Sequence, residues 1–287
     1  MASSVDVSLA EAIESWGRHH LRDLPWRRTR DPWRILVVEV MAQQTGLERV
    51  LGRWEDFCAR FPDPAALAGA EPGEVIRAWS GLGYNRRALA LHRAAVRIVE
   101  RHGGAVPRRL EDLLALPGVG PYTAHAVRAF AFEEAATVVD TNVGRVLARL
   151  SGRRLTRRGV EEIAARLAAG RDPWWWNQSI MEFGALICRA RSPGCDACPV
   201  GALCRWRGTG PDPAAGSAAV SGRQAPFAGS DREGRGRLVE ALRAGPVALA
   251  EAAAVMGWPD EPARAQQVIG RLLDEGLVRR RGEELVL

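Results

Sequence analysis

Four cysteines lie close together in the sequence and could bind a metal centre. Cys188, Cys195, Cys198 and Cys204 are spaced C-x6-C-x2-C-x5-C, whereas Cys58 stands alone. Thiolates on one short loop can close tetrahedrally around a zinc ion or hold an iron–sulfur cluster. In a reducing compartment such a group indicates a metal site rather than disulfides. The spacing alone does not choose between the two metals.

Glu39 is a first candidate for acid–base chemistry. It interrupts the apolar run at 35–42, and a helix that is apolar on nearly every side is buried. Burial raises the pKa of a carboxyl group, which suits an acid that must donate a proton near neutral pH. A buried structural glutamate paired with an arginine would give the same pattern.

Asp140 is a second candidate. It follows the apolar pair 138–139 and precedes a helical stretch at 141–147. The dipole and free N–H groups of a helix N-terminus favour an ionised carboxylate, although many Asp residues there are simple caps. Cleavage of an N-glycosidic bond needs such a pair, in which an acid protonates the leaving base and a carboxylate stabilises the cationic sugar.

A glycine turn, Gly118-Val119-Gly120, joins the helical stretches 110–116 and 122–132. Glycines let the backbone approach a phosphate closely, and Pro121 fits the first position of the next helix. The free N–H groups of that helix could then bind the anion. A Gly-x-Gly turn often only joins two helices, so this pattern alone is weak evidence.

The composition favours a polyanionic partner and excludes one reaction class. The formal charge is +6, and all 40 cations are arginine. A basic surplus suits nucleic acid, although it can also serve solubility alone. A Schiff base with an opened sugar needs an amine, usually lysine, so a lysine-dependent lyase activity is excluded. Without a signal peptide or a long apolar run, the chain is expected to be cytoplasmic, with no membrane contact.

The elements that must position these residues are mainly helices. From residue 7 to 206, apolar residues recur at helical spacing, for example at 75–79, 88–99 and 160–168. Residues 208–230 are rich in Gly, Ala, Ser and Pro, which predicts a flexible linker. Helices at 237–243, 249–256 and 263–275 and a hairpin at 277–287 then predict a winged-helix α+β domain. Its third helix and basic hairpin tip could contact DNA or another protein.

Over residues 20–206 the chain resembles the MutY-type adenine DNA glycosylases of the helix-hairpin-helix (endonuclease III) superfamily. The resemblance rests on Glu39-Val40-Met41-Ala42-Gln43-Gln44-Thr45, Gly81-Leu82-Gly83-Tyr84, the glycine turn, Val139-Asp140-Thr141-Asn142-Val143 and the cysteine loop, in that order. It implies a mainly α, two-lobed core: a six-helix barrel (31–133) and a helical lobe (1–30 and 134–207) with a [4Fe-4S] cluster. The linker (208–230) and the winged-helix-like domain (231–287) follow, as in shorter bacterial members that lack a Nudix-like domain.

The resemblance also implies roles for individual residues. Glu39 would protonate the flipped adenine, Asp140 would support the oxocarbenium ion, Asn142 would orient Asp140, and Tyr122 would replace the lysine of the lyase branch. Gln44 and Tyr84 would wedge into the base stack. Trp26, Arg27 and Glu182 would line the base pocket. The other DNA contacts would be made by Gln43, Gly118, Gly120 and Thr123. The cluster ligands would be Cys188, Cys195, Cys198 and Cys204. Asn85 and Ala42 depart from the family's usual Tyr and Leu, which leaves the lesion preference open.

We therefore predict a monofunctional, monomeric glycosylase of the bacterial nucleoid that removes adenine opposite 8-oxoguanine or guanine in double-stranded DNA. A G·T or G·U mismatch glycosylase on the same fold is the nearest rival, because Pro25-Trp26-Arg27 and Arg30-Asp31-Pro32 also occur in that branch. A non-enzymatic iron–sulfur winged-helix DNA-binding protein is the rival from another class. It would leave Glu39 and Asp140 without a purpose.

Overall fold

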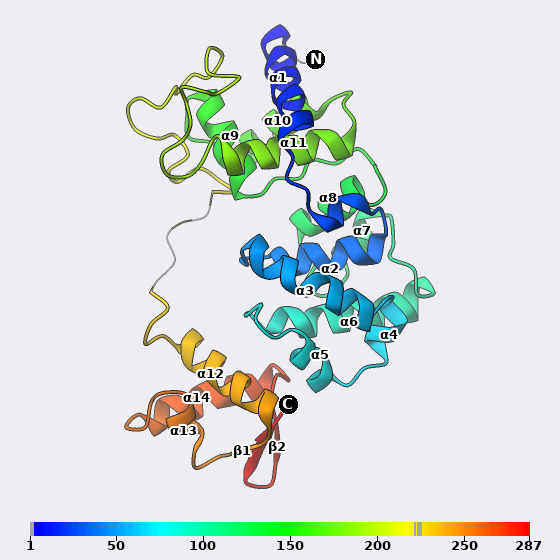
Figure 1. Ribbon diagram of the computed structural model, residues 1–287, viewed down its shortest axis with the longest axis vertical. Helices are drawn as coiled ribbons and strands as arrows, with labels where there is room; N and C mark the ends of the chain where they lie inside the picture. Colours follow the sequence, from blue (N-terminus) through cyan, green and yellow to red (C-terminus); the bar gives the residue numbers. More distant parts are fainter. Residues whose placement is uncertain (1–2, 221, 223–225) are drawn as a thin grey trace. The chain divides into compact units, whose positions relative to one another are not determined.

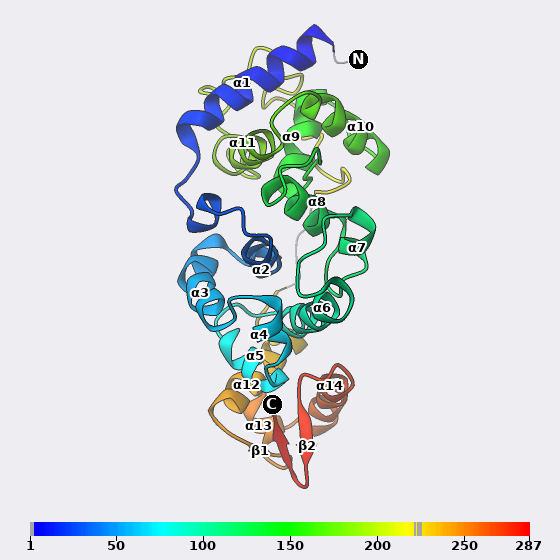
Figure 2. The same ribbon diagram turned by 90° about the vertical axis from the view of Figure 1, so that its right-hand side faces the viewer.

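The computed structural model describes residues 3–220, 222 and 226–287, and it is mainly α-helical, as predicted (Figures 1 and 2). The chain divides into two compact units: unit 1 is Met1–Ile35 with Gly120–Arg223, and unit 2 is Leu36–Val119 with Gln224–Leu287. Helix α2 (Pro32–Ala42) begins in unit 1 and continues into unit 2.

The elements of each unit follow the chain. Unit 1 contains α1 (Ser4–His20), the 3-10 helix η1 (Pro25–Arg28), α8 (Pro121–Phe130), α9 (Thr141–Ser151), α10 (Arg157–Ala168) and α11 (Pro173–Leu186). Unit 2 contains α3 (Leu47–Arg60), α4 (Pro64–Ala68), α5 (Pro72–Ala78), α6 (Arg86–His102), α7 (Leu110–Leu114), α12 (Asp231–Ala244), β1 (Val247–Ala248), α13 (Ala252–Val255), α14 (Pro262–Asp274), β2 (Arg279–Arg281) and β3 (Glu284–Val286). In the part of the chain that is described, no helix combines the length and apolarity needed to cross a bilayer.

The core of unit 1 lies between α1, α9, α10 and α11. Ile13, Val146, Leu147 and Phe183 are buried together there, and three of the loop cysteines pack against the same cluster. Helices α1 and α11 approach so closely at Gly17 that a Cβ atom would meet the side chain of Ser179. The apolar periodicity of these segments thus buries one face of each helix and fixes α9 and α11, which carry Asn142 and Glu182.

The C-terminal domain in unit 2 has the winged-helix form that the sequence predicts. Its sheet has the order β1-β3-β2 with antiparallel pairs, and Val247 of β1 pairs with Leu285 of β3. The two residues of β1 were not predicted, because so short a strand gives no alternating pattern. Helix α12 begins at Asp231, earlier than the expected residue 237, and α13 is shorter than the expected 249–256.

This domain packs onto helices of the same unit. Ile76 of α5 and Leu89 of α6 belong to the hydrophobic cluster formed by the domain's own helices and sheet. At Gly73 of α5, a Cβ atom would lie 3.0 Å from the main chain of Leu287. The shared core therefore attaches the C-terminal domain to α5 and α6 within unit 2.

Part of the predicted linker also packs against helical structure. Asp212 forms an ion pair with the buried Arg149 of α9, and Ala214 and Ser217 are themselves buried. The Ser217 hydroxyl accepts a hydrogen bond from the Leu155 N–H group at 2.9 Å. Residues 212–217 are thus held on unit 1, so this portion is not the flexible chain that its composition predicted.

Candidate functional site

Asp140 caps helix α9. Its carboxylate accepts hydrogen bonds from the Val143 N–H group and from Asn142 Nδ2, both at 2.7 Å. The position at a helix N-terminus and the orienting contact from Asn142 are as the sequence predicts. Burial nevertheless raises the pKa of Asp140 above its ordinary value, although these hydrogen bonds oppose the change. The N–H groups of the helix N-terminus thus favour the ionised carboxylate as predicted, but the effect of desolvation on the pKa is larger.

A chain of hydrogen bonds runs from Asp140 to the cysteine loop. Asn142, which donates to Asp140, accepts a hydrogen bond from Arg145 Nη2 at 2.8 Å. The same guanidinium donates to the carbonyl oxygens of Gly184 at 2.7 Å and Cys188 at 2.8 Å. Arg145 is buried and was missed by sequence reasoning, because its partners are distant main-chain groups that no local pattern reveals.

Glycine at position 184 permits this arrangement. A Cβ atom there would lie 2.8 Å from the Cβ and 3.0 Å from the carbonyl oxygen of Asn142. Because one neighbour is backbone, the contact could not be relieved by moving a flexible side chain. Helix α11 therefore approaches the start of α9 only through glycine.

The predicted base-pocket residues Arg27 and Glu182 are paired. Arg27 Nη2 lies 2.9 Å from the Glu182 carboxylate, and Arg22 also donates to it. Burial alone would raise the pKa of Glu182, but the hydrogen bonds from Arg22 and Arg27 lower it to about 2. Arg27 Nε also donates to Gln178. These contacts hold Glu182 as an anion, and they add Arg22 and Gln178 to the residues that the sequence indicated.

The remaining predicted pocket and acid residues lie in their expected elements. Trp26 is a buried residue of η1, and Tyr122 is partly buried in the first turn of α8. Glu39 is 9% exposed in α2, surrounded in the sequence by buried residues. Glu39 belongs to unit 2 and Asp140 to unit 1. Their cooperation at one nucleoside therefore remains a prediction.

The glycine turn has the backbone that its sequence predicts. Gly118 has a φ of +78°, and a Cβ atom there would meet the Cβ of Ala90 at 2.7 Å, so glycine is required. A Cβ at Gly120 would meet nothing within 4 Å, which leaves room for a ligand to approach the backbone. Thr123 is only 2% exposed. Thr123 is thus shielded from solvent in this structure, and its predicted contact with DNA remains a prediction.

The predicted wedge residues lie on two loops of unit 2. Gln44 and Tyr84 are exposed and have φ angles of +56° and +45°, a region that residues with side chains rarely adopt. The buried Arg87 joins the loops: it donates to carbonyl oxygens that include those of Gln43 and Gly83, and to the Thr45 hydroxyl. Burial lowers the pKa of Arg87 to about 10. Gln43 donates to the Gly118 carbonyl oxygen at 3.5 Å.

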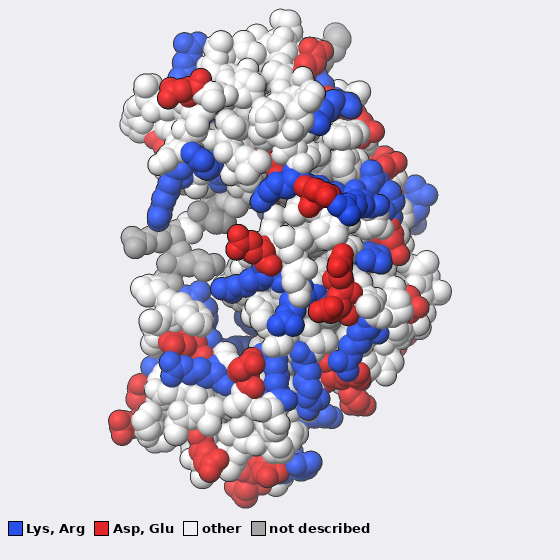
Figure 3. Space-filling model, in the orientation of Figure 1, with Lys and Arg blue, Asp and Glu red and all other residues white. Residues whose placement is uncertain are grey.

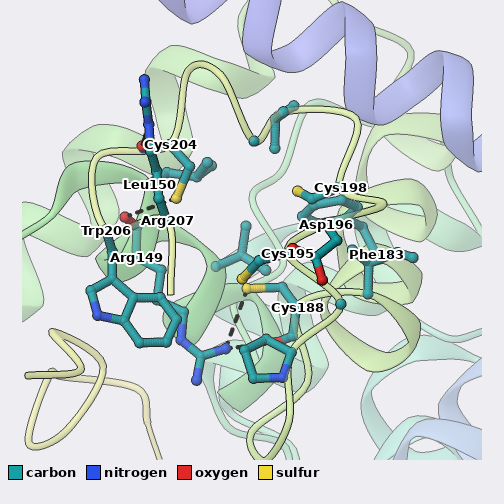
Figure 4. Close-up of a pocket in the computed structure, with 16 residues that line it drawn as sticks. Arg149, Leu150, Phe183, Cys188, Cys195, Asp196, Cys198, Cys204, Trp206 and Arg207 are labelled. Atoms are coloured by element: carbon teal, nitrogen blue, oxygen red, sulfur yellow. Dashed lines mark hydrogen bonds between the residues drawn. The ribbon is translucent and has the colours of Figure 1, made fainter. Parts of the chain in front are cut away.

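The four loop cysteines line one cavity of unit 1, with a volume of about 210 Å³ (Figure 4). Arg149 reaches into it and donates to the Cys188 sulfur at 3.5 Å and to the Arg189 carbonyl oxygen at 2.7 Å. Burial raises the pKa of the Cys188 thiol, while Arg149 opposes that change. The cysteine spacing thus brings the four thiols to one cavity as predicted, next to a buried cation that can offset thiolate charge.

Comparison with known proteins gives consistent matches. The family model for the HhH-GPD superfamily of base excision DNA repair proteins matches residues 37–169. An adenine DNA glycosylase of Mycolicibacterium smegmatis is 41% identical over 279 residues, which are 96% of this chain and 93% of that protein. The structure of a thermostable thymine-DNA glycosylase is 30% identical with a TM-score of 0.66, covering 71% of this chain and 97% of its own. A non-covalent complex of endonuclease III with DNA is 26% identical with a TM-score of 0.61, covering 70% and 94%.

Proposed function

The chain belongs to the HhH-GPD superfamily of base excision DNA repair proteins, and from that premise we propose that it is a monofunctional adenine DNA glycosylase. It hydrolyses the N-glycosidic bond of an adenine mispaired with 8-oxoguanine or guanine. The observation that carries the proposal is the 41% identity to the mycobacterial adenine DNA glycosylase, which extends over 96% of this chain. The substrate is bacterial double-stranded DNA, so the protein would act at the nucleoid.

In the proposed mechanism Asp140 stabilises the cationic sugar. One oxygen of its carboxylate accepts from the Val143 N–H group and the other from Asn142, so the plane of the group is fixed before substrate arrives. An ionised carboxylate in a poorly hydrated place interacts strongly with developing positive charge. As the glycosidic bond breaks, Asp140 therefore stabilises the oxocarbenium ion, which water then attacks.

Glu39 would supply the proton that the leaving adenine takes at its imidazole nitrogen. Its 9% exposure supports this assignment, because a poorly solvated carboxyl group keeps its proton more readily than an exposed one. The anionic Glu182 and its partner Arg27 would offer an acceptor and donors to the edge of the base. The chain contains no lysine, so the reaction ends at the abasic site without a lysine-dependent cut of the strand.

Extrusion of the adenine would depend on the wedge residues. Gln44 and Tyr84 are exposed at the tips of loops that Arg87 ties together, an arrangement that supports insertion of both side chains into the base stack. Their insertion would offset part of the few kcal/mol that flipping costs. The backbone at Gly118 and Gly120 would bind a phosphate without reading sequence.

We also propose that the four loop cysteines hold a [4Fe-4S] cluster. Cysteine thiolates are the ligands that hold such clusters in proteins, and the loop offers four of them. The same four thiols line one cavity of about 210 Å³, which supports a shared ligand. The bound cluster would order the loop and its arginines against DNA and take no part in base chemistry.

One assay tests the function against its rivals. Duplexes containing A·8-oxoguanine, A·G, T·G or U·G are incubated with the protein, and strand breakage is compared with and without alkali. The proposal requires adenine release that appears as a break only after alkali. Release confined to T·G or U·G would identify a mismatch glycosylase, the activity of the structurally similar thymine-DNA glycosylase. Tight binding without any release would identify a DNA-binding protein.

A further inference from the structure

The loop that carries Tyr84 contacts the C-terminal domain directly. Arg243, in the last turn of α12, donates from Nη2 to the side-chain oxygen of Asn85 at 3.0 Å and from Nε to the carbonyl oxygen of Ile76 at 3.3 Å. The Arg243 side chain is only 12% exposed, and it also pairs with Glu240. These bonds join the domain to both ends of the segment 76–85, which includes the wedge residue.

Tyr84 needs such support. Its φ of +45° lies in the left-handed region, where a residue with a side chain persists only when its surroundings fix it. Arg87 fixes the loop from the core side through the carbonyl oxygens of Leu82 and Gly83. Arg243 fixes the residue that follows Tyr84 from the other side. Asn85 is thus held by a part of the chain more than 150 residues away.

Helix α12, which carries Arg243, is held in place by a buried hydrophobic cluster. Leu238 and Leu242 of α12 share a buried cluster with Ile76 of α5 and Leu89 of α6. Leu287 lies against Gly73, where a Cβ atom would meet its main chain at 3.0 Å. Because α12 cannot move relative to α5 without opening this core, a hydrogen bond from its last turn positions the loop rather than merely following it.

The domain's own arginines are less suited to reading DNA. On α14, Arg264 and Arg271 both pair with Asp231. In the hairpin, the charges of Arg280 and Arg281 are compensated by Glu283 and Glu284. In Figure 3, blue and red side chains are likewise interspersed over much of the visible face. The positive charge that a phosphate would meet on these elements is thus offset within the domain.

We propose that the C-terminal domain braces the wedge loop, with Arg243 as a positioning residue that holds Asn85 and thereby presents Tyr84 to the base stack. The part concerning the base stack rests on the proposed function, whereas the mechanical coupling does not. Loss of the brace would free the loop to sample other backbone conformations. Extrusion of adenine would then require the loop to be reordered, and the rate of base release would fall.

Hydrogen exchange of the full-length protein tests the coupling without any activity. Asn85→Ala and Arg243→Ala should both accelerate amide exchange in the segment 81–85, and the double variant should add little to either, as expected for two ends of one contact. Arg237→Ala is the matched control, because Arg237 lies on the same helix and pairs with Glu233 of that helix. Unchanged exchange at 81–85 in both single variants would overturn the proposal.

Single-turnover cleavage tests the consequence. With enzyme in excess on an A·G duplex, Asn85→Ala and Arg243→Ala should lower the rate of adenine release about two- to tenfold, the range expected for one hydrogen bond. An adenine opposite an abasic site is already unpaired, so the defect should shrink on that substrate, whereas a general loss of structure would slow both equally. Equal rates for wild type and variants on A·G would refute the brace. No adenine release by the wild type would instead refute the proposed function, and the exchange result would still stand.

Discussion

Two opposing effects act on the carboxyl group of Asp140. Burial raises its pKa, while the Val143 N–H group and Asn142 stabilise its charge. Ionisation of a carboxyl group that is shielded from water lowers the stability of the protein without substrate. The same shielding strengthens the interaction of the carboxylate with a cationic sugar. In the proposed mechanism, the same residue therefore affects both the reaction rate and the stability of the fold.

Replacement of either carboxyl group should separate catalysis from binding. Asp140→Asn keeps a helix cap but removes the charge, and Glu39→Gln removes the proton donor, so each should slow single-turnover adenine release by about a thousandfold or more. Affinity for the duplex, measured by fluorescence anisotropy, should change little. A near-normal rate in either variant would show that its catalytic assignment is wrong.

The pH dependence follows from the direction of the Asp140 shift. Activity requires the ionised form, so the acid limb of the single-turnover profile should lie above the ordinary Asp pKa of 3.8. The raised pKa also means that the folded protein holds this proton more tightly than the unfolded chain. Ionisation of Asp140 therefore lowers the free energy of unfolding as the pH rises from 3.8 to the raised pKa. Asp140→Asn should lack this loss of stability between pH 3.8 and the raised pKa, although its amide group can no longer accept the hydrogen bond from Asn142 Nδ2 as well as that from Val143. Thermal unfolding of both proteins at several pH values measures it, and the same fall in stability with rising pH in the variant would contradict the assignment.

Substitution of Gly184 tests whether the close approach of α11 to α9 orients the carboxylate of Asp140. In Gly184→Ala the new methyl group would lie 2.8 Å from the Asn142 Cβ, so Asn142 must shift and the carboxylate of Asp140 loses its fixed orientation. We expect a fall in single-turnover rate of at least about tenfold. Gly159→Ala, in α10, meets only ordinary contacts and serves as the control. Equal rates in the two variants would remove any role for this close approach.

At the scale of elements, the cysteine loop depends on α9 for its shape. Arg149 of α9 donates to Arg189 and Ala190 of the loop, pairs with Asp212 and stacks on Trp206. One buried guanidinium therefore ties the helix, the loop and the following segment together. A residue so placed would affect whether the loop closes around the proposed cluster.

Arg149→Ala should reduce the iron and acid-labile sulfide bound per chain and should cost about 1–3 kcal/mol of unfolding free energy, because it leaves the Arg189 and Ala190 carbonyl oxygens without this donor. Arg191→Ala, an exposed residue of the same loop, should leave both unchanged. Metal analysis of the purified proteins measures the effect. Wild-type protein that is colourless and contains zinc would refute the iron–sulfur assignment and leave the glycosylase proposal intact.

Elements with a strong local pattern were predictable. Apolar spacing located α6 and α10, and cysteine spacing brought the four thiols to one cavity, because in each case neighbours in sequence create the feature. The brief strand β1 and the packed segment 212–217 were missed, since their partners lie far along the chain. The roles of Arg87, Arg145 and Arg149 were also missed. With 40 arginines in the chain, nothing local marks those that are buried.

At the scale of the whole molecule, the absence of lysine from the sequence makes a chemical prediction. Borohydride reduction during the reaction with an A·G duplex should trap no lysine-linked protein–DNA adduct, because no lysine amine exists to form a Schiff base. Endonuclease III treated with its own substrate is the positive control. A trapped adduct that maps to any residue other than the N-terminal amine would contradict the prediction.

The left-handed backbone at Gln44 and Tyr84 has a consequence for protein engineering. Glycine adopts such angles without a steric penalty, so Gln44→Gly or Tyr84→Gly is expected to raise the melting temperature slightly. Directed evolution for heat resistance alone would then favour glycine at both sites and delete the two side chains that we propose to enter the base stack. A selection scheme for a robust variant should therefore score mutation suppression in living cells alongside survival on heating.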